Sequence, residues 1–154
     1  MTDLTVLGGT AWTGTAPGPA NPTITGTISS STDWSDHIKS VSVNMAAAQQ
    51  DFTNFGSGGF VENKTGLLSA DISIEFFNDF AASEVDAVFG PGLLARTLYY
   101  FDFKPTAAAR SATNPSLVFA LYVASYPPLG VAVGDASMAS IGFMNAGKYA
   151  RLTS

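Results

Sequence analysis

The only histidine of the chain lies in the segment DWSDH at residues 33–37, whose side chains are of the types used in nucleophilic catalysis. In such sites a histidine takes the proton of a serine hydroxyl while an aspartate orients the histidine. Neighbouring residues of an extended segment point to opposite faces, so Ser35, Asp36 and His37 cannot pass a proton along one line. We therefore expect no catalytic role for this segment and interpret it as a solvated loop.

Metal and phosphate sites lack their usual residues as well. The chain has one histidine and no cysteine, and its carboxylates do not follow the spacing of a calcium loop or a zinc-binding helix. The glycine-rich stretch 56–59 is not followed by Lys-Ser or Lys-Thr, as a phosphate-binding loop requires. The triplet at 63–65 matches a glycosylation acceptor but follows no secretory signal. The sequence thus predicts no catalytic residue, no metal, no cofactor and no enzyme.

Two carboxylates share one face of a strand that begins at residue 66 and stops at Asn78 and Asp79. Its residues alternate with a period of two, which places one set on a buried face and the other on a polar face. The apolar set is Leu68, Ala70, Ile72, Ile74 and Phe76, and the polar set is Ser69, Asp71, Ser73 and Glu75. Asp71 and Glu75 would be about 13 Å apart at roughly 3.3 Å per residue, too far for the carboxylate pair of a glycosidase. A solvated face is the plain interpretation.

The elements that position these residues are mostly short strands separated by turn residues. Further strands are predicted over residues 4–7, 23–28, 38–44, 97–104, 117–126, 137–144 and 149–153, the last two as a pair around a turn at 145–147. The strand over 117–126 is apolar on both faces, so both faces must be covered.

One short helix is expected between the strands. Apolar side chains recur at helical spacing through 82–89, and Ser83 followed by Asp86 resembles a capping box. The Gly-Pro-Gly sequence at 90–92 is expected to end the helix. Because so short a helix must lie against a sheet, the predicted fold class is mainly β, a β-sandwich or barrel of two packed antiparallel sheets with one short flanking α-helix.

Length and charge describe a single domain with an unusual surface. The chain has 154 residues, of which the first 35, rich in Gly, Pro, Thr and Ser, are interpreted as an arm with edge strands and residues 36–154 as the main β domain. Charged residues make up 12%, about half the usual fraction, so we expect partners to cover part of the surface. The net charge of −5 and the scattered Lys and Arg argue against a protein that grips nucleic acid. No signal peptide or membrane span is evident, which gives the cytoplasm as the default location.

Several stretches, in order, resemble the middle of major tail proteins (tail tube proteins) of long-tailed bacteriophages. They are DFTNFGSGG at 51–59, GLLSADISIEFFNDFAA at 66–82, VD at 85–86, SATNP at 111–115, PPLG at 127–130, VGD at 133–135 and the closing strand at 147–153. The similarity covers about residues 36–154.

This resemblance implies a structural virion protein that self-assembles into stacked, hexameric rings forming the tail tube, the conduit for DNA ejection. Its partners would be copies of itself and other phage tail proteins, with DNA passing through the lumen without specific binding and with no membrane. It would be made in the bacterial host cytoplasm and reside in the virion tail. The candidate lumen face is Asp71, Ser73 and Glu75, and the candidate inter-subunit loop is Asp51, Phe52, Phe55, Gly56, Gly58, Gly59 and Phe60.

Two other functions remain open. A capsid decoration or cement protein, or another head-tail structural protein, would also be built from β-structure with an apolar surface. A carbohydrate-binding module would use Trp12, Trp34 and the tyrosines as stacking platforms, although these aromatics are not grouped in the sequence. A hydrolase is disfavoured, because no perturbed carboxylate pair or cleft histidine is evident.

Overall fold

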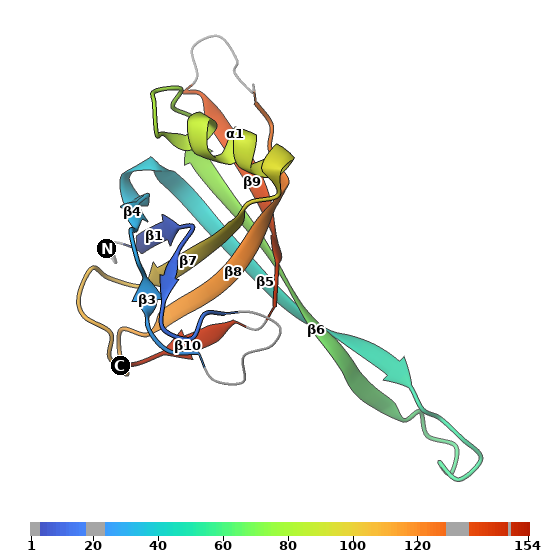
Figure 1. Ribbon diagram of the computed structural model, residues 1–154. Helices are drawn as coiled ribbons and strands as arrows, with labels where there is room; N and C mark the ends of the chain where they lie inside the picture. The colour runs from blue at the N-terminus through green and yellow to red at the C-terminus, as the bar shows by residue number, and fades with distance from the viewer. Residues whose placement is uncertain (1–3, 18–23, 129–135, 148) are drawn as a thin grey trace.

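The computed structural model describes residues 4–17, 24–128, 136–147 and 149–154. In this part of the chain, strands predominate and one α-helix is present (Figure 1). The strands are β1 (Thr5–Gly9), β2 (Trp12–Thr13), β3 (Thr27–Ile28), β4 (Thr32–Asp33), β5 (Ile38–Asp51), β6 (Asn63–Phe77), β7 (Leu98–Lys104), β8 (Ser116–Ser125), β9 (Met138–Asn145) and β10 (Ala150–Leu152). The 3-10 helix η1 (Ser35–His37) precedes β5, and the helix α1 (Val85–Ala95) lies between β6 and β7.

One antiparallel sheet contains eight of these strands, in the order β4-β1-β7-β8-β9-β6-β5, with β10 also paired to β8. The two ends of this order, β4 and β5, are consecutive in the chain and joined through η1. The sheet therefore curls around a shared core, in which Trp34, from the β4–η1 connection, packs edge-on against Phe76 of β6 and also contacts Phe89 of α1. The mainly β fold with one flanking helix is confirmed.

A separate two-stranded sheet, β2-β3, packs against β7. Trp12 of β2 contacts Tyr100 of β7, with ring centroids 5.6 Å apart, and Ile28 of β3 is buried. β8 is buried on both faces: Val118 and Phe119 are neighbours that point to opposite faces, and both have no exposed surface. The expectation from the apolar pattern of this strand is confirmed.

A buried ion pair fastens the loop between β7 and β8 to the β2-β3 sheet. Asp102 of β7 is 3% exposed, and its carboxylate accepts from Arg110, at 2.9 Å, and from the hydroxyl of Ser116. Arg110 also donates to the carbonyl of Gly26, at 2.8 Å. One guanidinium thus links β7, its following loop and the segment that enters β3.

The N-terminal segment belongs to this same body. β1 lies between β4 and β7 in the large sheet, and Val6 is fully buried in the core. The strand expected over 23–28 is limited to β3 in the described residues, and residue 23 lies outside them. The turn expected at 127–130 is likewise only partly within the described residues.

The predicted end of the helix is wrong, because Gly-Pro-Gly at 90–92 lies inside α1. The helix instead ends at Arg96, whose left-handed backbone (φ 53°) forms the C-cap. Gly92 has a packing role: a Cβ at this position would lie 2.1 Å from the hydroxyl oxygen of Tyr99. That hydroxyl donates to the carbonyl of Val88, at 2.8 Å. The contact with β7 outweighs the local stop signal.

The predicted capping box is also wrong. The N-cap residue is Glu84, no side chain caps the helix, and Ser83 has a positive φ of 71°. The carboxylate of Asp86 is used elsewhere, because it accepts a hydrogen bond from the hydroxyl of Tyr126 at 2.5 Å. Among the described residues, no helix has the length and apolarity needed to cross a membrane.

The expected pairing of the last two strands is wrong as well. β9 and β10 do not pair with each other; both lie along β8, β9 opposite residues 121–125 and β10 opposite residues 116–118. Between them the amide of Ala146 donates to the carbonyl of Ala120, at 2.7 Å. This bond keeps the chain on the edge of β8, where β10 continues the line of β9.

Candidate functional site

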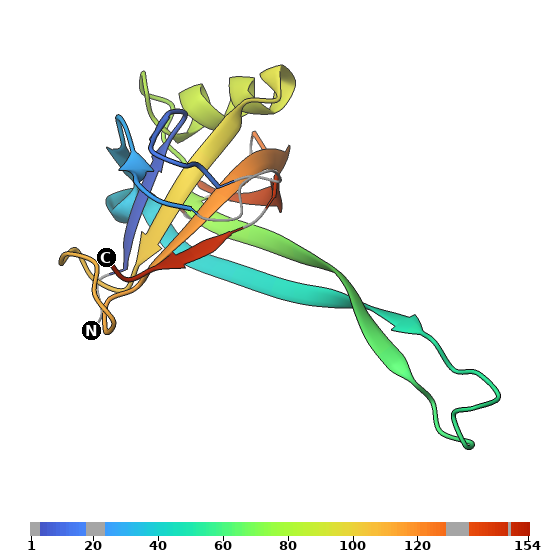
Figure 2. The same ribbon diagram turned by 60° about the horizontal axis from the view of Figure 1, so that its bottom comes forward.

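The hairpin of β5 and β6 is the part of the structure that extends beyond the body (Figures 1 and 2). β6 pairs with β9 only from Asp71 to Phe77, whereas it pairs with β5 from Asn63 to Phe76. Beyond Asp71 the sheet is therefore reduced to a two-stranded ribbon, which contains a register shift between Ala47 and Gln49. Both strands are longer than expected, running to Asp51 and from Asn63 instead of to 44 and from 66.

The predicted alternation of β6 holds within the body and fails in the ribbon. Ile72, Ile74 and Phe76 are buried, as expected, but Leu68 of the same set is 76% exposed. The reason is that no third strand or helix covers the ribbon at that point. Leu67, its neighbour on the other face, is 86% exposed, so both faces of the ribbon present apolar side chains.

The structure places the candidate lumen residues together on the face of β6 that points away from the core. Asp71 and Ser73 are exposed, and Glu75 is partly exposed. Most of their antiparallel partners on the same face are small or polar, whereas the apolar Met144 of β9 lies opposite Asp71. The small or polar partners are Asn44, Ser42 and Ser40 on β5, and Gly142 and Ser140 on β9. Hydrogen bonds lie within this face, from Ser40 to Glu75 at 3.0 Å and between the hydroxyls of Ser73 and Ser140 at 3.4 Å.

The electrostatic character of this face is acidic with one balancing cation. Lys39 lies 3.7 Å from Glu75, and both side chains are solvent-exposed, so the pair contributes little to stability. Asp71 has no ion pair among the described residues.

The candidate inter-subunit loop forms the far end of the hairpin, with Asp51 as the last residue of β5. Its apolar side chains are exposed: Phe55 fully, Phe60 by 78% and Val61 by 69%. Phe52 is partly covered by the ammonium of Lys64, 4.8 Å from the ring centroid. The resemblance predicts that this loop contacts another subunit, and within one subunit these three side chains stay exposed.

Hydrogen bonds nevertheless hold this loop in one shape. The amide of Phe52 donates to the carbonyl of Glu62 at 2.8 Å, and the side chain of Asn54 accepts from the amide of Gly56 at 2.8 Å. Gly58 and Gly59 have φ of 60° and 85°, where an added Cβ would meet no atom, so the backbone conformation alone favours glycine there.

Asp51 orders the start of the loop. Its carboxylate accepts from the hydroxyl and, at 2.8 Å, from the amide of Thr53, and these bonds lower the pKa of Asp51. The Thr53 hydroxyl in turn accepts from the amide of Glu62, at 3.1 Å, across the loop.

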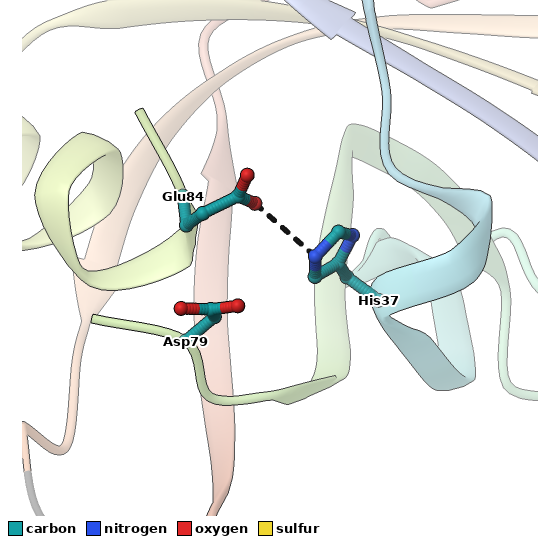
Figure 3. A group of neighbouring side chains, drawn as sticks. All are labelled: His37, Asp79 and Glu84. Carbon is teal, nitrogen blue, oxygen red and sulfur yellow. Dashed lines mark ion pairs between the residues drawn. The ribbon is translucent and has the colours of Figure 1, made fainter. Parts of the chain in front are cut away.

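The segment at 33–37, whose residue types match those of a catalytic triad, makes other contacts. Ser35 bonds to Asp33, and its hydroxyl also accepts from the amide of Val6 at 3.0 Å. His37 pairs with Glu84, with Nε2 and Oε2 3.1 Å apart (Figure 3). The serine thus bonds to an aspartate and the histidine to a glutamate, whereas in a catalytic triad the histidine bonds to both the serine and the aspartate.

His37 is also part of a group that the sequence analysis missed. Ligand atoms of His37, Asp79 and Glu84 lie within 4.8 Å of one another, the latter two from the connection between β6 and α1 (Figure 3). One imidazole and two carboxylates are a set that can hold a divalent cation. An ion pair between η1 and the start of α1 accounts for the same geometry, and no spacing in the sequence could have signalled the group, because its members are 42 and 5 residues apart.

The two tryptophans do not form an exposed platform. Trp34 is 3% exposed within the core, and Trp12 packs on Tyr100 between the two sheets. Because a stacking site needs an exposed ring face, Trp34 cannot serve as one.

Three solved structures similar to this chain come from a tail tube, a tail and a virion. The SPP1 tail tube matches with a TM-score of 0.64 and 9% identity over 99% of this chain and 78% of that chain. The tail of an empty gene transfer agent particle, solved with C6 symmetry, matches with a TM-score of 0.60 and 14% identity over 75% of this chain and 82% of that one. The virion of a native gene transfer agent particle matches at 0.59 and 14%, over 75% and 85%. No family model and no curated protein matches.

At these identities the likeness establishes the fold, and it confirms the resemblance drawn from the sequence: this chain has the fold of phage tail tube proteins.

Proposed function

We propose that this chain is a structural subunit of a phage-type tail, which assembles with copies of itself into stacked rings that form a tail tube. The observation that carries the proposal is the β5–β6 hairpin, an ordered element that extends from the body and exposes apolar side chains over both faces and its loop. A two-stranded ribbon is marginally stable in water by itself, and an exposed apolar patch of this kind usually marks a protein interface.

The free edge of β5 supports lateral association in a ring. β5 has 14 residues and pairs only with β6 in the described part of the chain, so its outer backbone groups are available to another strand. Long exposed edge strands are templates for pairing with another chain. The C6 symmetry of one similar tail makes six subunits per ring the number we propose.

The acidic polar face of β6 fits the wall of a channel for DNA. Asp71, Ser73 and Glu75 lie among serines and asparagine, without clustered Lys or Arg. Such a surface repels phosphates and offers them no cationic grip, so DNA would slide. We assign this face to the lumen and the loop at 52–62 to contacts between subunits.

Electron microscopy of the concentrated protein tests the proposal. We expect rings or tubes to form from the purified chain alone, and light scattering to show a mass that rises with concentration. The variant Phe55→Asp should weaken assembly, whereas Leu94→Asp on the exposed side of α1 is a matched control. A decoration protein would instead stay monomeric or trimeric, and protein that stays so at every salt concentration would contradict the proposal.

The lumen assignment has its own test. The double variant Asp71→Lys and Glu75→Lys changes the charge by +4 per subunit, and its tubes should retain short DNA at low salt and release it as salt rises. Asp36→Lys, exposed on η1, is the control for a general charge effect. Equal DNA retention by the wild-type and double-variant tubes would remove these residues from the channel wall.

A further inference from the structure

A groove of about 1120 Å³ opens where the hairpin leaves the body of the subunit. Its lining is largely apolar and comes from the hairpin, the end of β9 and the region of β10: Ile24, Met45, Leu68, Met144, Tyr149 and Leu152. Asp71 and Arg151 add one charge of each sign. Asp71 lies at the end of the polar face of β6, so the groove begins where that face stops.

The exposed side chains of this groove are of a kind that adapts to a partner. Met45 and Met144 are each 49% exposed, and Leu68 is 76% exposed. Methionine is unbranched and polarisable, so a surface built with it repacks around an inserted aromatic ring and forms favourable sulfur–ring contacts.

The hairpin loop carries the side chains that could fill such a groove. Phe55, Phe60 and Val61 are the exposed apolar residues at the far end of the same hairpin. Asp51 and Glu62 lie beside them in the sequence, so carboxylates are present to meet Arg151 of the groove.

The loop cannot reach the groove of its own subunit. Six residues of continuous strand separate Met45 from Asp51, roughly 20 Å at about 3.3 Å per residue, and β5 stays paired with β6 over that length. An apolar projection and an apolar recess on one rigid chain can therefore be joined only between copies, head to tail.

We propose that the loop at 52–62 of one subunit docks into the groove around Met45, Leu68 and Met144 of another copy of this chain. The inference rests on the proposed function, which makes a second copy the occupant, and it adds the acceptor surface. Because donor and acceptor differ, the contact is heterologous and extends an assembly instead of closing a dimer.

Cross-linking tests this contact directly, because the natural chain has no cysteine. The single variants Phe55→Cys and Met45→Cys are purified, assembled alone or mixed, and treated with a short bismaleimide. We expect a cross-linked dimer only in the mixture, and a ladder of higher species from the double variant Phe55→Cys and Met45→Cys. Leu94→Cys, exposed on α1, replaces Met45→Cys in the control mixture and should give no product.

A coupling measurement supports the same test without cross-linker. Phe55→Ala and Met45→Ala should each raise the concentration needed for assembly at least about fivefold, which corresponds to loss of a contact worth roughly 1 kcal/mol. The double variant should be no worse than the more affected single variant, because both remove the same contact. Both positions are exposed, so thermal unfolding of the dilute subunit should be unchanged.

The outcomes separate this inference from the proposed function. Rings or tubes that form without the mixed cross-link, or with fully additive alanine effects, would overturn the docking and leave the tube proposal standing. If the wild type forms no ring or tube, the tube proposal fails, and the mixed cross-link at high concentration still decides whether the loop and groove of two copies meet.

Discussion

Replacing Gly92 by alanine separates the helix propensity of α1 from its packing on the sheet. A Cβ at this position would lie 2.1 Å from the hydroxyl oxygen of Tyr99, so the ring must move. Gly90, two residues earlier in the same helix, is the control, because a Cβ there would lie at ordinary contact distances, 3.5 Å from the ring of Tyr126 and 3.8 Å from Oδ1 of Asp86. Alanine raises the helix propensity at both positions, but less at Gly90, because the ring of Pro91 crowds a Cβ on the residue before it. Only the Cβ at Gly92 meets Tyr99.

The magnitudes follow from three contributions. Alanine in place of helical glycine stabilises by about 1 kcal/mol. At Gly92, overpacking costs about 1–3 kcal/mol, and displacement of Tyr99 removes its hydrogen bond to Val88, worth about 0.5–1.5 kcal/mol. We therefore expect Gly92→Ala to destabilise the subunit by roughly 1–3 kcal/mol and Gly90→Ala to stabilise it by at most about 1 kcal/mol, since Pro91 offsets part of the gain.

Urea unfolding followed by circular dichroism, on protein too dilute to assemble, measures this difference. With a slope of about 2 kcal/mol per M, the midpoints of the two variants should differ by roughly 0.5–2 M. Equal midpoints would refute the reasoning, because they would mean that the approach of Gly92 to Tyr99 does not constrain the helix.

Three other predictions concern the charged and titratable groups. Asp102→Ala leaves Arg110 without its buried partner, so the free energy of unfolding should fall by about 3–5 kcal/mol, and a loss below about 1 kcal/mol in urea unfolding would show that the pair is not structural. Hydrogen bonds from Thr53 lower the pKa of Asp51, so the order that this carboxylate gives the loop should be present above its ordinary pKa of 3.8 and be lost as the pH falls through the lower folded value. The amide signal of Thr53 in an NMR titration reports this transition, and Asp51→Ala should abolish it. Burial and, next, the hydrogen bond to the carboxylate of Asp86 raise the pKa of Tyr126. The stabilising effect of the protonated Tyr126 hydroxyl should be complete below pH 10.0 and be lost as the pH rises through the pKa of the folded state. Tyr126→Phe should reduce the loss of stability at alkaline pH, and an unchanged alkaline profile would contradict this.

The sequence was sufficient to predict which side chains are buried in the part of β6 that lies within the body, but not in the part that forms the ribbon. Alternation correctly separated Ile72 and Ile74 from Asp71 and Ser73 because a third strand, β9, and the core cover one side there. Leu68 follows the same alternation, but its burial depends on a neighbour that the subunit does not supply. A period of two reports which residues share a face, and tertiary structure decides whether that face is covered.

The helix errors have a similar physical origin. Gly-Pro-Gly at 90–92 and the pair Ser83 and Asp86 are strong local signals, yet at each of them a tyrosine from outside the helix makes a contact that the pattern does not include. Tyr99 requires a residue without a Cβ at Gly92, and Tyr126 engages the carboxylate of Asp86. A glycine or a cap contributes about 1 kcal/mol and a proline inside a helix about 3 kcal/mol, which the packing of α1 on the core through Val85 and Phe89 can exceed.

The group at His37 shows the limit of motif reading for sites. Its carboxylates come from one connection and its imidazole from another, and the fold of the curled sheet brings them together. Sequence spacing identifies sites built on one element, such as the polar face of β6, whereas sites assembled from separate connections require the topology.

The low fraction of charged residues has a structural counterpart in the exposed apolar residues of the hairpin. The small fraction of charged residues predicted that partners cover part of the surface, without indicating which part. In the structure, Phe55, Phe60 and Leu68 concentrate that requirement on one projecting element, while the face with Asp71 and Glu75 keeps its polar groups. One hairpin thus separates a face suited to solvent and polyanions from surfaces suited to protein. A subunit that needed only cover could have closed the hairpin onto its own body; projecting it makes the cover dependent on another molecule, which is the condition for an assembly that extends.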